Sequence, residues 1–132
     1  MKLQFAALAL FVGLGFSTQS FAGGRAPVIE PARVELSADN TDPELVKQAI
    51  INGAAARTWK VIEEKPGQLT LQLVVRQKHT VVINADYDAR GYRLSYVSSV
   101  NMDHYPRNGK PYIHSSYNRW LNLLMQSISF VK

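Results

Sequence analysis

The chain has 132 residues, a formal net charge of +5 at pH 7 and no cysteine. This length suits one domain rather than two. The lack of cysteine excludes disulfides, thiol nucleophiles, iron–sulfur clusters and cysteine zinc sites. Basic and acidic residues are interspersed without a long run of like charge, a balance that favours a solvated surface or loose attraction to anionic polymers and gives no support for nucleic-acid binding.

The first 22 residues have the pattern of a cleavable export signal. Lys2 precedes an apolar run over residues 3–16, and the small residues Ser20 and Ala22 mark a cleavage site. Because about 20 apolar residues are needed to cross a bilayer, we expect cleavage after Ala22 and no membrane span in the mature chain. A bacterial lipid anchor would need a cysteine at that site. The predicted location is therefore the periplasm, or the exterior of the cell.

Residues 23–40 contain prolines and glycines with little periodicity, which predicts a flexible leader, although residues 33–36 fit an edge strand. A helix start follows, with Asp42 before Pro43 or with Thr41 and Glu44 as a capping box. We expect an amphipathic helix, because the apolar and small residues recur at the helical period on one side: Leu45, Val46, Ala49, Ile50, Gly53 and Ala56.

Four segments then have the character of strands, and alternation of apolar and polar residues is clearest in the middle two: residues 59–64, 68–76, 79–87 and 92–97. Turn signals separate them, among them Pro66-Gly67 and a hairpin loop that ends at Gly91. Alternation of this kind is typical of half-buried antiparallel strands. Short connections favour a meander in which each strand pairs with the next.

A polar loop over residues 99–111 precedes a final helix that is predicted to run from about residue 112 to residue 130, with its apolar stripe on one side. The predicted fold class is therefore α+β. We expect a four-stranded antiparallel meander flanked by an N-terminal and a C-terminal helix, in the order αββββα, forming one domain over residues 41–132.

His114 is the first candidate for function, because the prediction places it in the first turn of the final helix. Helix amides there favour the neutral imidazole that a metal ligand or general base requires. Asn118, one turn later, would orient the ring. The alternative is structural: His114 caps the helix or ties the preceding loop to it.

The loop before the helix offers a second kind of site. Tyr105 and Tyr112 would supply aromatic contacts and Arg107 and Lys110 positive charge, which together predict a binding edge for an envelope glycan, peptide or protein. A non-enzymatic binding or accessory module is the leading hypothesis, with no cofactor expected. Two alternatives stay open: metal handling through the loop and helix residues His104, His114 and Met102, with His79 as a further ligand, and a small hydrolase.

One group of motifs extends over most of residues 41–124. It comprises Trp59 after the first helix, the Pro66-Gly67 turn, Ser99 and Asn101 in the loop, and Ile113-His114-Ser115-Ser116-Tyr117-Asn118-Arg119-Trp120. This pattern resembles that of an uncharacterised family of small exported bacterial proteins, some of them lipoproteins, although the anchoring cysteine of the lipoproteins is missing here. The resemblance implies an envelope location and a compact α+β fold. It adds Asn101, Tyr117 and Asn118 to the candidate binding residues.

Overall fold

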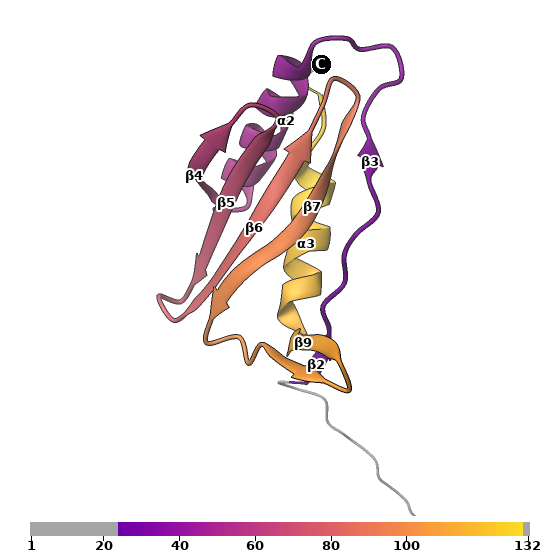
Figure 1. Cartoon of the computed structure of the whole chain (residues 1–132). Coiled ribbons are helices and arrows are strands. Elements are labelled where there is room, and N and C mark those ends of the chain that lie inside the picture. The colour runs from indigo at the N-terminus through magenta and orange to yellow at the C-terminus, as the bar shows by residue number, and fades with distance from the viewer. Residues whose placement is uncertain (1–23, 131–132) are drawn as a thin grey trace, which may run out of the picture.

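The computed structural model describes residues 24–130, so the predicted export signal lies outside the described residues. The described chain is an α+β fold with two helices and two antiparallel sheets (Figure 1). The larger sheet has five strands in the order β3-β7-β6-β5-β4. Their bounds are β3 Val34–Glu35, β4 Lys60–Lys65, β5 Gln68–Val75, β6 His79–Tyr87 and β7 Gly91–Val100.

The four predicted strands are present as the meander β4 to β7, and short β3 adds a fifth strand beside β7. The alternation also identified the inner face of the sheet. Its residues form the core with the helices, and they include Leu69, Leu71, Val81, Ile83 and Leu94. Figure 1 shows both helices on this side of the sheet. The other face is uncovered within residues 24–130, where Val74 and Val97 are 48% and 44% exposed.

β7 is longer than predicted because a β-bulge shifts its register. Ile83 pairs with Tyr96, whereas the neighbouring Val82 pairs with Ser98, so Val97 is the extra residue. A bulge of one residue moves every later side chain to the opposite face. Ser99 therefore lies on the inner side, where its hydroxyl is 2.8 Å from that of Tyr96. Ser98, the polar residue that interrupts the alternation, therefore marks the bulge and not the end of the strand.

The first helix, α2, spans Pro43–Ala56, and of the two predicted caps Asp42 is the one used, because its carboxylate accepts the Glu44 N–H at 3.0 Å. The second helix, α3, spans Ser116–Ser127. The two helices meet at Gly53, where an added Cβ would lie 2.6 Å from Ile128 Cγ1. Neither of these helices is long and apolar enough to span a membrane.

The second sheet corrects the sequence prediction at both ends of the domain. It has the order β2-β9-β8, with bounds β2 Arg25–Pro27, β8 Tyr105–Arg107 and β9 Lys110–His114. The final helix was thus predicted to begin too early, since residues 110–114 are a strand and α3 begins at Ser116. The structure also has more strands than the four expected, because β3 joins the larger sheet and β2, β8 and β9 form the second sheet. Part of the predicted leader forms β2, and the predicted edge strand is β3.

The turn between β6 and β7 is organised by one carboxylate. Asp88 Oδ1 accepts hydrogen bonds from the guanidinium of Arg33 at 2.7 Å and from the backbone N–H groups of Arg90 and Gly91 at 2.9 and 3.1 Å. These donors favour the ionised carboxylate. They lower the pKa of Asp88 to about 2, and the Arg33 hydrogen bond is the largest cause.

This pKa predicts an acid-dependent loss of stability. Asp88 binds its proton more weakly in the folded chain than in the unfolded chain, so its contribution is complete above about pH 4 and is lost as the pH falls towards 2. Asp88→Asn keeps an oxygen acceptor for the turn and removes the titration. We expect the free energy of unfolding, measured with urea from pH 6 to pH 2, to fall less steeply in Asp88→Asn between pH 4 and 2. Asp86→Asn, on the neighbouring strand, is the control. Identical profiles for the wild type and Asp88→Asn would contradict the account.

Candidate functional site

Basic side chains are concentrated at one end of the molecule. We call this end the basic end. It comprises the β5–β6 turn, the β8–β9 hairpin, β2 and the first turn of α3 (Figure 1). These segments carry Arg25, Arg76, Lys78, Arg107, Lys110 and Arg119. Asp103, in the loop between β7 and β8, is paired with Arg25 at 2.9 Å. No ion pair within residues 24–130 includes Arg76, Arg107 or Arg119. The chain's ten acidic side chains all fall in this described range.

A cavity of about 320 Å³ opens at the basic end, and we call it the basic cavity. Arg76 and His79 reach it from the β5–β6 turn and the start of β6, and His114 from the end of β9. α3 contributes Arg119 and Trp120. Three separate elements therefore place two guanidinium groups, two imidazoles and an indole around one concavity. Such convergence of polar groups on a pocket is typical of ligand sites.

Backbone hydrogen bonds define the protonation pattern of the two imidazoles. His79 Nδ1 lies 2.7 Å from the carbonyl oxygen of Asn101, to which it donates. His114 Nδ1 accepts the backbone N–H of Ser116 at 3.1 Å, which caps the start of α3. In the neutral rings, Nε2 of His79 is therefore a hydrogen-bond acceptor and Nε2 of His114 a donor. His114 thus lies at the end of β9 and not, as predicted, in the first turn of the final helix; its bond to Ser116 ties the preceding segment to α3, and the residue also lines the cavity.

The two predicted asparagines hold chain segments together. Asn101 donates from Nδ2 to the carbonyl of Lys78 at 2.8 Å, which ties the end of β7 to the β5–β6 turn. Asn118 accepts the N–H of Ile29 at 3.2 Å and donates to the carbonyl of Pro27 at 3.0 Å. The Asn118 amide thus pairs with an extended backbone as a strand would. Both side chains therefore hold chain segments of the basic end in place.

Tyr117, the third residue singled out by the helix motif, belongs to the core. Its side chain is fully buried and its ring packs edge-on against that of Tyr96, with centroids 5.8 Å apart. The hydroxyl has no hydrogen-bond partner within the described residues. Burial raises the pKa of Tyr117 well above its ordinary value. The phenol therefore fills space and does not reach a ligand from this position.

The remaining predicted binding residues come together on the β8–β9 hairpin. Tyr105 pairs with Tyr112 across the strands and Arg107 with Lys110, so all four lie on one face of the hairpin, which we call the hairpin face. The two tyrosine rings have centroids 6.1 Å apart, and the Arg107 guanidinium lies 5.5 Å from the centre of the Tyr112 ring. The four residues that were predicted to form a binding edge thus lie in one compact group of two aromatic and two basic side chains.

The metal and hydrolase alternatives find little geometric support. Met102 and His114 line the basic cavity together with His79, but His104 stacks on Tyr96, with ring centroids 4.5 Å apart, and does not line it. Residues 24–130 contain no group of three or more His, Asp or Glu side chains placed to hold a metal ion. In the same range no hydrogen bond joins a serine hydroxyl to His114.

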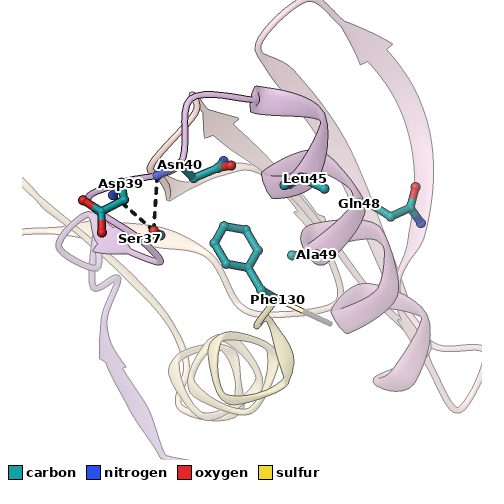
Figure 2. A pocket seen from close by; sticks show the side chains of 7 residues that line it. All are labelled: Ser37, Asp39, Asn40, Leu45, Gln48, Ala49 and Phe130. Carbon is teal, nitrogen blue, oxygen red and sulfur yellow. Dashed lines mark hydrogen bonds between the residues drawn. The ribbon is translucent and has the colours of Figure 1, made fainter. Parts of the chain in front are cut away.

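A larger cavity, of about 550 Å³, lies at the opposite end between α2 and the segment before it (Figure 2). Figure 2 shows the Phe130 ring directed into this space towards Ala49. The polar groups at its rim bind other parts of the chain. Ser37 Oγ accepts the N–H groups of Asp39 and Asn40, and the Asn40 amide donates to the carbonyl oxygens of Asp42 and Ala89. Because the Ser37 hydroxyl and the Asn40 amide are bonded within the chain, we regard the smaller basic cavity as the better candidate site.

No family model, curated protein or solved structure matches the chain. The resemblance to small exported bacterial proteins therefore stays a prediction. The site rests on the geometry of the described residues alone.

The sequence did not single out Arg76, Arg119 and Trp120 as site residues. Arg119 and Trp120 lie inside the helix motif. Their neighbours in the fold could not be predicted, because the start of α3 was predicted too early. Arg76 and the following Gln77 both have positive φ, at 57° and 55°, an uncommon conformation for side chains of this size. The tight turn between β5 and β6 was the one available signal for Arg76 and His79. It brings both residues to the same end of the sheet.

Assigning Tyr117 to the core yields a direct prediction. Tyr117→Phe removes a buried hydroxyl that has no partner in residues 24–130, so the free energy of unfolding should stay unchanged or rise by up to about 1–2 kcal/mol. Urea unfolding of the purified variant measures this. Tyr96→Phe, which removes the hydroxyl next to Ser99, is the matched control and should lower stability. A loss of stability in Tyr117→Phe larger than that in Tyr96→Phe would show that its hydroxyl has a partner.

Proposed function

We propose that the protein is a non-enzymatic binding module of the bacterial envelope that recognises an anionic glycan through the hairpin face. The observation that carries the proposal is the grouping of Tyr105, Tyr112, Arg107 and Lys110 on one exposed hairpin, at an end of the molecule where Asp103 is already paired with Arg25. Exported polymers with carboxylate or phosphate groups are natural partners for such a surface.

The aromatic and basic residues have complementary uses in this proposal. The apolar C–H face of a sugar ring packs on an aromatic ring, and the tyrosine hydroxyls remain available to sugar hydroxyls. Arg107 is held against the Tyr112 ring, so less side-chain entropy is lost when the guanidinium binds an oxyanion. Lys110 adds a mobile charge beside it. The hairpin face thus combines stacking with charge recognition.

The size and composition of this surface favour a glycan over a folded protein. A stable protein interface usually buries about 800 Å² on each partner, with an apolar centre. The hairpin is only ten residues long, from Tyr105 to His114, and none of the exposed large aliphatic residues within residues 24–130 lies on it. A strand of sugar units needs only a few adjacent contacts, which the hairpin face supplies.

The proposal predicts how binding responds to substitution. A uronic-acid hexasaccharide should bind the mature chain, residues 23–132, more tightly than a glucose hexasaccharide. Tyr112→Ala and Arg107→Ala should each raise its Kd about fivefold to tenfold, because each removes a stacking or cation contact of about 1 kcal/mol. Isothermal titration calorimetry measures the affinities, and the melting temperature checks the fold.

Arg90→Ala is the matched control, since it removes the same charge from an exposed residue at the other end of the sheet. It should leave the Kd unchanged. Equal affinities for the uronic-acid and glucose chains, or equal effects of Arg107→Ala and Arg90→Ala, would refute the proposal. Tighter binding of an acidic peptide than of the uronic-acid chain would replace the glycan with a protein partner.

A further inference from the structure

We infer that the basic cavity is a specific subsite for one sugar-acid unit, a sugar that carries an oxyanion next to a free hydroxyl. The inference rests on the proposed function and extends it, because the hairpin face and the basic cavity lie at the same end of the molecule. His114 lies on β9, two residues after Tyr112, and it lines the cavity.

The charge in the cavity wall is uncompensated. Arg76 and Arg119 line the same concavity, and neither forms an ion pair with any acid within residues 24–130. Arg33, by contrast, is paired with both Glu35 and Asp88, at 2.8 and 2.7 Å. Two cations around one hollow repel each other, and an oxyanion between them would turn that repulsion into two charge-assisted hydrogen bonds.

The imidazoles add one donor and one acceptor. With Nδ1 of His114 accepting the Ser116 N–H, the Nε2–H of a neutral His114 donates, which suits a carboxylate or phosphate oxygen. With Nδ1 of His79 bound to the Asn101 carbonyl, Nε2 of a neutral His79 accepts, which suits a hydroxyl. The ring centroids are 6.4 Å apart, so one small ligand can contact both rings. An anion alone would leave the His79 acceptor unused, whereas a sugar acid uses both.

The shape of the cavity agrees with a single sugar unit. Its volume of about 320 Å³ is at the low end of the range of about 300–1,000 Å³ that is typical of small-molecule sites. Trp120 contributes an aromatic wall, and the buried side chain of Met102 makes the floor apolar. A sugar ring can pack its C–H face on such a surface while its polar groups meet the arginines and histidines.

Arg76 is held at this site by an unfavourable backbone conformation. Arg76 and Gln77 both have positive φ, a conformation for which turns of this type favour asparagine and glycine. Residues other than glycine adopt this conformation only uncommonly. Strain at a cavity rim fits a residue retained for its side chain.

The test uses the mature chain and three small probes: glucuronate, glucose and acetate. Glucuronate has both the carboxylate and the neighbouring hydroxyls, and each of the other probes lacks one of these features. We expect glucuronate to bind tightest by NMR titration. Arg76→Gln and Arg119→Gln should each raise its Kd about tenfold or more, since each removes a charge-assisted hydrogen bond. Arg93→Gln, an exposed arginine on the larger sheet, is the control and should bind as the wild type does.

The outcomes separate this inference from the proposed function. Glucuronate affinity that is equal in Arg119→Gln and Arg93→Gln, or no stronger than that of glucose or acetate, would overturn the subsite. If the uronic-acid hexasaccharide then still depends on Tyr112 and Arg107, the hairpin proposal stands without it. If glucuronate binding needs Arg76 and Arg119 while Tyr112→Ala and Arg107→Ala bind the hexasaccharide normally, the subsite stands and the hairpin proposal falls. Melting temperatures of all variants exclude misfolding as the cause.

Discussion

The pairing of β2 with β9 is the interaction on which the basic end depends. Ala26 pairs with Ile113, whose side chain is fully buried, and the flanking bonds run from Val28 N–H to the Pro111 carbonyl at 3.0 Å and from Ser115 N–H to the Gly24 carbonyl at 2.9 Å. Two bonds from the Asn118 amide lock the same segment onto α3. The ladder therefore orients the hairpin, His114 and the start of α3 together.

Within the helix motif, the residues with structural roles differ from those that line the candidate site. Along residues 113–120, Ile113 and Tyr117 fill the core, His114 caps α3 and Asn118 clamps the N-terminal segment. Arg119 and Trp120 face the basic cavity. Arg119 thus lines the cavity, and no ion pair within residues 24–130 includes it. Arg119 and Arg76 line the same cavity, and an oxyanion bound between them is the ligand that we infer for this subsite.

The larger sheet was predictable because the alternation of its strands reports directly on burial. The fully buried Leu69, Leu71 and Ile83 all have the predicted orientation. The small sheet was not predicted, for two reasons. Residues 112–114 are compatible with both a helical stripe and a strand, although Asn108-Gly109, with φ of 53° and 79°, was a strong hairpin signal. β2 has only three residues and pairs with a strand more than 80 residues away in the sequence, so no local pattern predicts it.

The candidate site was predicted in part for the same physical reasons. Tyr105, Tyr112, Arg107 and Lys110 fall close together in the sequence, and the hairpin places them on one face. The cavity joins residues from β6, β9 and α3, so its composition depended on packing that no local pattern contains. Asn101 and Asn118 were found as unusual polar residues, but their hydrogen bonds to distant backbone groups identify them as clamps.

The most direct test of the account is to map where an anionic glycan binds. Titration of the ¹⁵N-labelled mature chain with a uronic-acid hexasaccharide, followed by amide chemical shifts, locates the contact surface without any substitution. The account predicts that the largest shift changes fall at the basic end, over residues 75–79 and 102–120. Changes centred on the uncovered face of the larger sheet, or on the cavity beside Phe130, would contradict it.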